Sequence, residues 1–317
     1  MRRLIGKRLL QFVPVLFGVS FLTFALLNAL PGDTAEQILG TSATAQSLAE
    51  LRRQLHLNQP LLERYFTWLG GLFSGHLGSS LITAQPVASV ISQRLPVTAE
   101  LIVLALFGAL FLAIPVATIG AFQMEGAFDR ISRLVSMFAL STPAFILGVV
   151  LILLFTVQVH WLPSTGFSPL SHGIWANLRT MILPTVTLSA VLFATYTRIL
   201  RADMAEQLIN EDYVQTARAK GVTERRMLIY HVLRNSLFGL VTVVGVNMGT
   251  LIGGTVIVES IFALPGIGQD LVISITSKDT TVVQGIVLLI GLVVIFSNLF
   301  ADLLYTVIDP RVRYGRV

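Results

Sequence analysis

The sequence predicts an all-α, polytopic membrane protein with six transmembrane helices. Three observations predict it: 54% of the 317 residues are hydrophobic, only 12% are charged, and six long windows contain no Asp, Glu, Lys or Arg. A soluble domain carries about 25% charged residues. Each window has roughly the 17 to 25 residues needed to cross a hydrocarbon core. We expect helices because an unpaired backbone group in lipid costs several kcal/mol, and a helix pairs its own groups.

The six windows follow one another along the chain, with polar segments between them. The fourth is the shortest and has Pro184 near its start. The windows cover residues 9–32, 101–122, 134–159, 180–197, 235–258 and 280–301. The predicted parts of the chain are an N-terminal cytoplasmic anchor with the first helix (1–32), a large extracytoplasmic loop (33–97), a membrane core (98–308) and a cytoplasmic tail (309–317).

The basic residues predict the orientation of the chain in the membrane. With the N-terminus inside, the cytoplasmic segments carry 16 of the 22 Lys and Arg residues. Basic residues concentrate in the cytoplasmic loops of membrane proteins. We therefore expect both termini and the polar insert at 198–236 to be cytoplasmic. The first apolar stretch is longer than the roughly 7 to 15 residues of a signal-peptide core, which favours a retained anchor.

The outer loop, residues 33–97, carries apolar residues at helical spacing. The two sets are Leu48, Leu51 and Leu55, then Leu62, Phe66, Leu69 and Phe73. This pattern predicts a pair of short interfacial helices that cover the bundle. The same surface is equally suited to contact an extracytoplasmic partner, and the two interpretations are compatible.

The insert at 198–236 is the longest charged stretch in the C-terminal two-thirds of the chain. From Arg198 to Arg234 it carries seven basic and five acidic side chains. The residues before Gly221 are good helix formers, and Gly221 can end a helix in the left-handed conformation. Thr223 then caps a second short helix. Such a hairpin of small and basic residues is suited to docking at the membrane surface.

Within the insert, residues 213–221 read Tyr-Val-Gln-Thr-Ala-Arg-Ala-Lys-Gly, and residues 231–234 read His-Val-Leu-Arg. This stretch resembles the cytoplasmic loop of binding-protein-dependent ABC importer permeases, whose pattern is Glu-Ala-Ala, three residues, Gly and, after an apolar stretch, Ile-x-Leu-Pro. Gln215 to Ala217 stand at the Glu-Ala-Ala positions and Gly221 is the glycine, whereas the Glu, Ile and Pro of the pattern are absent. The form Tyr-x-x-Thr-Ala-Arg-Ala-Lys-Gly is similar to the dipeptide, oligopeptide and nickel branch of the family.

Other segments resemble the same branch, so the resemblance extends over most of the chain. They include Glu259 to Gly268, which follows the Glu-x-x-Phe-x-x-Pro-Gly-x-Gly pattern of an outer segment, Arg94 to Leu101, and Asp309 to Gly315. The resemblance implies an ABC type I importer permease fold in a bacterial cytoplasmic (inner) membrane. It implies as partners a second homologous permease subunit, two ATPase subunits or domains, and an extracytoplasmic peptide-binding protein.

The resemblance also implies a function and a docking site. The chain would be a transport subunit rather than an enzyme, and would form with the second permease a path for short peptides, with nickel chelates or glutathione as alternative cargoes. Small side chains would let an ATPase approach closely, and basic ones would pair with its acidic groups. Arg225 and Arg226 could instead act only as basic loop residues that set the orientation of the chain in the membrane. The implied docking residues are Tyr213, Thr216, Ala217, Arg218, Ala219, Lys220, Gly221, Arg225 and Arg226.

Three glycines in the fifth window, Gly245, Gly249 and Gly253, recur at intervals of four residues. One helix face is thereby stripped of side chains, which allows another helix to approach closely. We expect a packing role for these glycines, with a part in a moving gate as the alternative. Asn247 is expected to hydrogen-bond a neighbouring helix or to line a hydrated path.

Several kinds of site are absent from the sequence. There is no Gly-x-x-x-x-Gly-Lys-Ser/Thr phosphate loop, no cysteine, and no metal-ligand spacing among the five histidines. We expect no catalytic, cofactor or metal site in this chain, with ATP and Mg on the partner ATPase subunits, and no nucleic-acid binding. The alternative class is a self-sufficient carrier or pore. However, the windows lack the charged groups that proton-coupled carriers bury, and no residue can be assigned to a substrate path.

Overall fold

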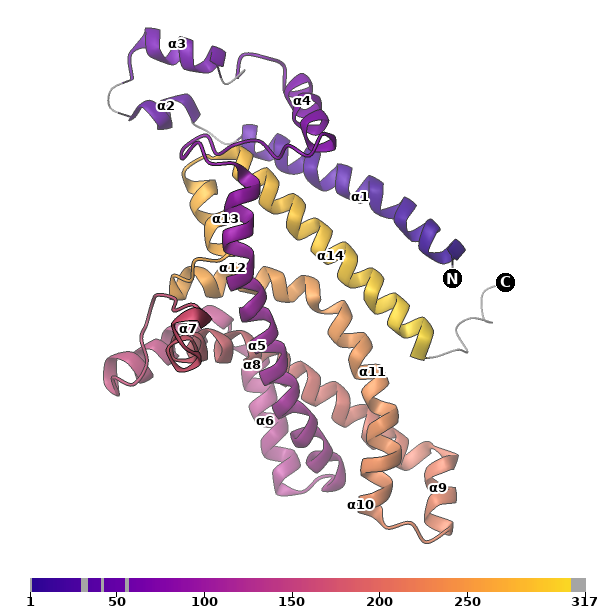
Figure 1. The fold of residues 1–317 in the computed structure, drawn as a ribbon. Coiled ribbons are helices and arrows are strands. Elements are labelled where there is room, and N and C mark those ends of the chain that lie inside the picture. The colour runs from indigo at the N-terminus through magenta and orange to yellow at the C-terminus, as the bar shows by residue number, and fades with distance from the viewer. Residues whose placement is uncertain (1, 30–33, 41–42, 55–56, 309–317) are drawn as a thin grey trace. The chain divides into compact units, whose positions relative to one another are not determined.

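The computed structural model describes residues 2–29, 34–40, 43–54 and 57–308 (Figure 1). Regular secondary structure in these ranges is helical, apart from one isolated antiparallel bridge between Ser79 and Pro86. The all-α prediction is confirmed. The end of the first window, 30–32, and the predicted tail, 309–317, lie outside the described residues.

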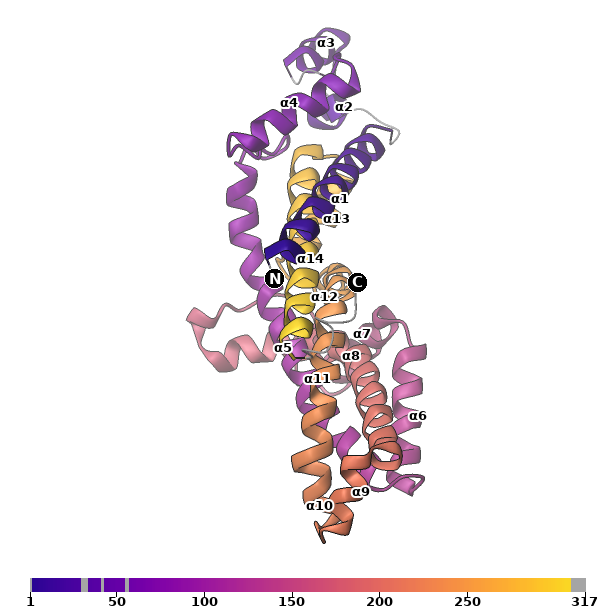
Figure 2. The ribbon, with the colours of Figure 1, turned by 90° about the vertical axis from the view of Figure 1, so that its right-hand side faces the viewer.

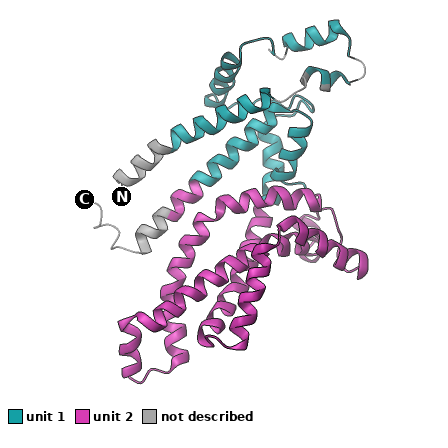
Figure 3. Ribbon diagram, turned by 180° about the vertical axis from the view of Figure 1, so that it is seen from behind, with its two compact units in different colours: residues 1–98, 265–295 teal, residues 99–264, 296–317 magenta. Residues whose placement is uncertain are grey.

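The chain forms two compact units, which Figure 3 shows in different colours. Unit 1 comprises residues 1–98 and 265–295, and unit 2 comprises residues 99–264 and 296–317. Two long helices, α5 (Val87–Phe122) and α14 (Thr280–Ile308), contribute residues to both units. The outer loop thus folds with a later segment of the chain, which the sequence assigns to the membrane core.

Unit 1 contains the outer loop and the helices around it. Besides parts of α5 and α14, its helices are α1 (Arg2–Ala29), α2 (Thr34–Leu39), α3 (Ala45–Gln54), α4 (Leu61–Phe73) and α13 (Ile267–Thr276). α3 and α4 are the two short helices that the apolar spacing predicts. Tyr65 of α4 is buried against the edges of the Phe21 and Phe24 rings of α1, and its hydroxyl hydrogen-bonds Ser20 at 2.9 Å. One helix of the outer loop therefore covers α1.

A second core in unit 1 joins the beginning of α5 to α13 and α14. It consists of Val87, Ile267, Val282 and Ile286. Next to it, the Asp279 carboxylate accepts hydrogen bonds from the N–H of Leu81 at 3.2 Å, the N–H of Val282 at 3.3 Å and the hydroxyl of Ser80. Asp279 therefore caps the N-terminus of α14 and attaches to it the loop that precedes α5.

Unit 2 is a helical bundle around α8 (Ile174–Asn210), a helix of 37 residues. α8 contacts α6, α7, α11 and α12, and residues such as Met181, Leu192 and Leu200 are buried along its length. The other elements of the unit are α6 (Ala127–Ser141), α7 (Ala144–Leu151), η2 (Ile152–Gln158), η3 (Leu170–His172), α9 (Asp212–Ala219), α10 (Glu224–Met227), η4 (Leu228–Val232), α11 (Leu233–Val246) and α12 (Met248–Phe262).

The described helices are consistent with the predicted number of membrane spans. Five are long and apolar enough to cross a membrane, and up to seven spans result if two bent helix pairs are each counted as one. The predicted six lies within this range. Four of the windows fall wholly or largely within α1, α5, α8 and α14. α8 extends beyond its window at both ends, and Pro184 lies inside it without ending it.

The window at 134–159 is not the single straight helix that the sequence predicts. α6 ends at Ser141 and α7 begins at Ala144, and the two helical segments are bent by 103°. Pro143 accounts for the break, because proline has no N–H to donate and disfavours helical backbone at the residue before it. That residue, Thr142, is extended, with ψ of 118°.

The window at 235–258 is also divided, at Asn247. α11 ends at Val246 and α12 begins at Met248. Asn247 adopts a turn conformation with ψ near zero, at −4°, and its carbonyl accepts the N–H of Leu251 at 3.0 Å, which starts the next helix. Asparagine is a poor residue for a helix interior because its side chain competes for backbone hydrogen bonds.

Candidate functional site

The predicted docking residues lie in the elbow, residues 211–227, which contains α9 and α10. The elbow connects α8 to a second long helical segment that runs from Glu224 through η4 to Val246. In both Figure 1 and Figure 2, α9 and α10 lie at the same end of unit 2 as the turn between α5 and α6. Val214 and Met227 have no exposed surface, so α9 and α10 are each anchored from within.

The turn between α9 and α10 is a Schellman motif that ends α9 at a glycine. Gly221 has a φ of +77°, and its N–H donates to the carbonyl of Arg218 at 2.9 Å. The N–H of Val222 donates to the carbonyl of Ala217 at 3.1 Å. The left-handed conformation predicted for Gly221 is confirmed. A β-carbon added there would meet no atom within 4 Å, so backbone conformation rather than crowding favours glycine.

The exposed side chains of Arg218 and Glu224 form an ion pair across this turn. Nε of Arg218 lies 3.0 Å from Oε1 of Glu224, and Nη2 lies 3.5 Å from Oε2. Both side chains are about half exposed, at 45% and 57%, so the pair contributes at most about 1 kcal/mol. Arg218 therefore has a structural contact in addition to the docking role predicted for it.

The second helix of the elbow is longer than the sequence predicts. Thr223 precedes α10 with extended backbone, as an N-cap residue does, and its carbonyl accepts the N–H of Met227 at 2.9 Å. Within the described residues, its hydroxyl makes no capping hydrogen bond. α10 continues without interruption through the π-helix η4 into α11. The predicted short helix is therefore part of a helical segment of 23 residues, from Glu224 to Val246.

Gln207 of α8 joins three helices at the base of the elbow. Its Oε1 accepts a hydrogen bond from the hydroxyl of Tyr213 in α9 at 2.5 Å. Its Nε2 donates to Asp203 at 2.8 Å and to Ser236 of α11 at 2.9 Å. Tyr213, predicted to face an ATPase, thus binds with its hydroxyl to the supporting helix.

Most of the predicted docking residues lie on the surface of the elbow. Tyr213 and Ala217 are half-buried. The exposed ones are Thr216, Arg218, Ala219, Lys220, Gly221, Arg225 and Arg226. In the part of the chain that the structure describes, no acidic side chain forms an ion pair with Lys220, Arg225 or Arg226. The surface thus combines small side chains with basic groups that remain available to a partner.

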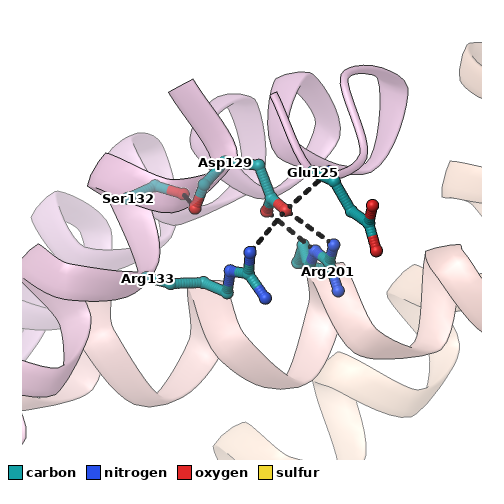
Figure 4. A network of polar contacts seen from close by, with 5 residues as sticks. All are labelled: Glu125, Asp129, Ser132, Arg133 and Arg201. Atoms are coloured by element: carbon teal, nitrogen blue, oxygen red, sulfur yellow. Dashed lines mark hydrogen bonds and ion pairs between the residues drawn. The ribbon is translucent and has the colours of Figure 1, made fainter. Parts of the chain in front are cut away.

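A buried ion pair connects α6 to α8, and sequence reasoning missed it. Asp129 has no exposed surface and accepts two hydrogen bonds from Arg201, from Nε at 2.9 Å and from Nη2 at 2.8 Å (Figure 4). The N–H of Glu125 donates to the same carboxylate at 3.1 Å, and Nη2 of Arg133 lies 3.4 Å from it. The carboxylate is thus satisfied from three sides.

From the sequence alone, Arg133 and Arg201 count only among the basic residues that predict the orientation of the chain in the membrane. The signal that could have identified the pair is Asp129, an acid in the first turn of a helix, where the helix dipole favours negative charge. Gly120 of α5 makes room for the pair, since a β-carbon there would lie 3.3 Å from Oδ1 of Asp129 and 3.6 Å from Cγ of Arg201. Three helices therefore meet at this carboxylate.

The three glycines of the fifth window do not form one packed face within the chain. Gly245 is buried, and a β-carbon there would overlap the methyl group of Ala301 in α14. Gly253 is exposed, and a β-carbon there would meet no atom within 4 Å. Gly249 is half-buried. The repeat is divided between two helices, because Gly245 lies in α11 whereas Gly249 and Gly253 lie in α12.

Two protein families match this chain. Residues 109–314 match the family described as binding-protein-dependent transport system inner membrane component. Residues 1–102 match the family described as the N-terminal part of the membrane component of such a system. The first match contains the elbow and the Asp129–Arg201 pair, and the second contains the outer loop.

Relatives of similar length match nearly the whole chain. A protein of Brucella abortus (strain 2308), named as a peptide transport system permease, is 39% identical over 314 residues, covering 99% of this chain and 100% of that protein. One of Sinorhizobium fredii, named as a peptide ABC transporter permease, is 37% identical over 97% of this chain and 98% of its own length. The glutathione transport system permease protein GsiC of Escherichia coli (strain K12) is 38% identical, with the same coverage. This chain therefore belongs to the family of binding-protein-dependent transport system inner membrane components, as a permease subunit of an ABC importer.

Proposed function

We propose that this permease forms, with a second homologous permease, a path through which short peptides cross the inner membrane. An extracytoplasmic binding protein delivers the peptide, and two ATPase subunits or domains supply the energy. The observation that carries the proposal is the elbow, an exposed helix–glycine–helix structure with basic groups available to a partner. Because the sequence contains no phosphate-binding loop, ATP and Mg are bound by the ATPase subunits.

The proposed orientation places the elbow and both termini in the cytoplasm. The distribution of basic residues supports it, since 16 of the 22 Lys and Arg residues are then on the inner side. The exposed residues of the elbow would contact the ATPase at this surface. Arg225 and Arg226 contribute to both the orientation and the contact.

The elbow is positioned to transmit a movement to two long helices. It joins the 37 residues of α8 to the 23-residue segment from Glu224 to Val246. Gln207 of α8 forms hydrogen bonds with Tyr213 of α9 and Ser236 of α11. A displacement of α9 would therefore shift both α8 and the segment that contains α11. The Asp129–Arg201 pair extends this connection to α6. Alternating access then follows as a shift between two packed arrangements of rigid helices.

Glutathione is the second candidate cargo. The relatives from Brucella abortus and Sinorhizobium fredii are named for peptide transport, which supports peptides, whereas GsiC of Escherichia coli is named for glutathione transport. Glutathione is itself a small peptide, so both cargoes present amide and carboxylate groups to a hydrated path. The binding protein and the path would together discriminate between the two cargoes.

Reconstitution of the co-purified permeases, ATPases and binding protein in liposomes tests the proposal. Labelled short peptides and glutathione are supplied separately, with ATP or without it. We expect uptake and stimulated ATP hydrolysis only with ATP and a loaded binding protein, and stronger stimulation by short peptides. Uptake and stimulated hydrolysis with glutathione, but not with short peptides, would identify glutathione as the cargo. Uptake by this purified chain without nucleotide would refute both in favour of a self-sufficient carrier.

A further inference from the structure

A cavity of about 130 Å³ lies between α6 and α8 in unit 2. It adjoins the Asp129–Arg201 pair, and Figure 4 shows two of its lining residues, Arg133 and Arg201, beside that carboxylate. The side chains that matter for its chemistry are Arg133, Ser136, Thr197, Arg198, Arg201 and Ala202. The surface of the cavity is mostly apolar, and two of the arginines beside it, Arg133 and Arg198, have no part in the coupling proposed for the elbow.

Two hydroxyl groups in the cavity wall have no hydrogen-bond partner among the described residues. They belong to Ser136, which is 3% exposed, and Thr197, which is 4% exposed. A buried hydroxyl in a helix can donate to a carbonyl of the preceding turn, as Thr195 does to Val191 at 2.8 Å. Buried polar groups without partners are rare in folded proteins. Both hydroxyl oxygens are themselves buried within the wall, so a ligand in the cavity does not reach them.

The lining of the cavity carries an excess of positive charge. Arg201 is held by both oxygens of Asp129, but Arg133 reaches that carboxylate with one nitrogen only, at 3.4 Å. Arg198 is exposed, and no acidic side chain in the described ranges pairs with it. Arg198 and the singly contacted Arg133 therefore favour an anion beside the cavity.

The surface of α6 beside the cavity is apolar and exposed. Leu134 is 65% exposed, Met137 is 64% exposed and Phe138 is 71% exposed, and Met137 also lines the cavity. On a helix of an integral membrane protein, such side chains are suited to contact acyl chains. A ligand that fits the guanidinium groups and this apolar surface has an anionic head and apolar chains.

We propose that this cavity binds an anionic phospholipid. The phosphate lies against Arg198 and Arg133, and an acyl chain lies against the apolar surface of the cavity at Met137. Basic pockets between transmembrane helices on the cytoplasmic side are suited to anionic headgroups. The inference rests on the proposed function for its orientation, which places this end of unit 2 at the cytoplasmic leaflet.

Lipid binding by the purified full chain tests this site. The chain in detergent is titrated with phosphatidylglycerol, phosphatidylcholine or inorganic phosphate. Native mass spectrometry measures whether the added molecule is retained, and the shift in unfolding temperature measures whether it stabilises the chain. We expect retention and stabilisation with phosphatidylglycerol only. Arg198→Gln should weaken the apparent affinity about fivefold, the contribution of one arginine at an anionic surface. Ala202→Trp, which fills the cavity without changing its charge, should abolish retention.

Arg130→Gln is the control for charge, because Arg130 is exposed on α6, the other helix of the site, and does not line the cavity. It should bind phosphatidylglycerol as the unmodified chain does. Equal weakening by this variant would indicate a diffuse surface attraction, and equal stabilisation by inorganic phosphate would indicate a small-anion site. Either outcome would overturn the proposal, as would full retention by Ala202→Trp.

The assembled complex provides a second measurement. The bound phosphatidylglycerol should remain when the second permease is present, and its loss would show that the other permease covers this face and would overturn the proposal. Retention of lipid is measured without ATP or transported cargo. Loss of the lipid proposal can therefore be distinguished from loss of the proposed transport function, which liposome uptake tests separately.

Discussion

Asp129 and Arg201 stand 72 residues apart in the chain and meet through two hydrogen bonds of 2.9 and 2.8 Å. The carboxylate is fully buried, whereas the Arg201 side chain is 21% exposed. A buried ion pair adds little stability over a well-packed apolar replacement, but loss of one partner leaves the other charge uncompensated. The pair therefore chiefly specifies how α6 packs against α8.

Asp129→Ala should lower the free energy of unfolding by about 3 kcal/mol, because Arg201 then remains partly buried without its counter-ion. Thermal unfolding in detergent measures this loss. Arg133→Gln is the control and should cost less than about 1 kcal/mol, since Arg133 is half exposed and reaches the carboxylate with a single contact at 3.4 Å. Joint replacement of Asp129 by Leu and Arg201 by Met should restore most of the stability. Equal losses in the first two variants would contradict the structural role of the pair.

Gly221→Val should leave the chain inserted in the membrane but reduce ATP-driven uptake at least about tenfold. The φ of +77° is strained for a β-branched residue, so the Schellman turn would open and displace α9. Uptake and ATP hydrolysis are measured together in liposomes that contain the whole complex. We expect hydrolysis to lose its dependence on the loaded binding protein.

Gly221→Asn is the matched control, because asparagine adopts the left-handed conformation more readily than other residues with a β-carbon. The structure leaves space for its side chain, since a β-carbon at this position meets no atom within 4 Å. Uptake by the Asn variant should therefore be within about twofold of the unmodified complex. If Val and Asn variants transported equally well, the turn would have no part in coupling.

The helices are predictable where apolar runs and turn residues agree. The uncharged window at 101–122 lies inside α5, and the left-handed Gly221 follows from a glycine placed after good helix formers. Pro143 and Pro184 show the limit of such reasoning. Both stand in long apolar windows, yet the first separates α6 from α7 and the second is accommodated within α8. Tertiary packing along the helix decides between these outcomes, and a single sequence does not encode it locally.

The exposed surface of the elbow was also predictable, because it depends on local helix periodicity and on a family pattern. The ion pair of Asp129 and Arg201 was not, since it joins helices separated by 72 residues. The same limit applies to Tyr213. Its place in the motif suggests a contact with a partner, but its hydroxyl binds Gln207, six residues earlier in the chain.

Tyr213→Phe should remove a hydrogen bond worth about 1 kcal/mol and should alter how stability depends on pH. Burial raises the pKa of Tyr213 above the ordinary value of 10.0; a hydrogen bond to Asn235 opposes the shift, and the charges of Glu211 and Asp203 add to it. The folded state thus keeps the phenolic proton to higher pH than the unfolded state. The stabilisation is complete below the unfolded pKa and is lost as pH rises through the folded one.

The difference in unfolding free energy between the unmodified chain and Tyr213→Phe should therefore be constant from about pH 7 to 9 and decrease above about pH 10. Chemical unfolding in detergent across this range measures it. Taking the difference between the two proteins removes the contribution of other groups that titrate in alkali. A difference that increased above pH 10 would mean that the folded chain stabilises the ionised phenol, contrary to the burial of Tyr213.

Gly245→Leu should destabilise the chain and Gly253→Leu should not, although both glycines come from the same four-residue repeat. The added side chain at Gly245 would overlap Ala301, so α11 and α14 must separate, and the free energy of unfolding should fall by at least about 1 to 3 kcal/mol. At Gly253 the added side chain enters open space, and the stability of the isolated chain should change by less than about 0.5 kcal/mol. Thermal unfolding of both variants measures the difference. Equal losses would show that α12 packs its glycine against a helix of the same chain, and equal tolerance would show that α11 and α14 do not depend on close contact at Gly245.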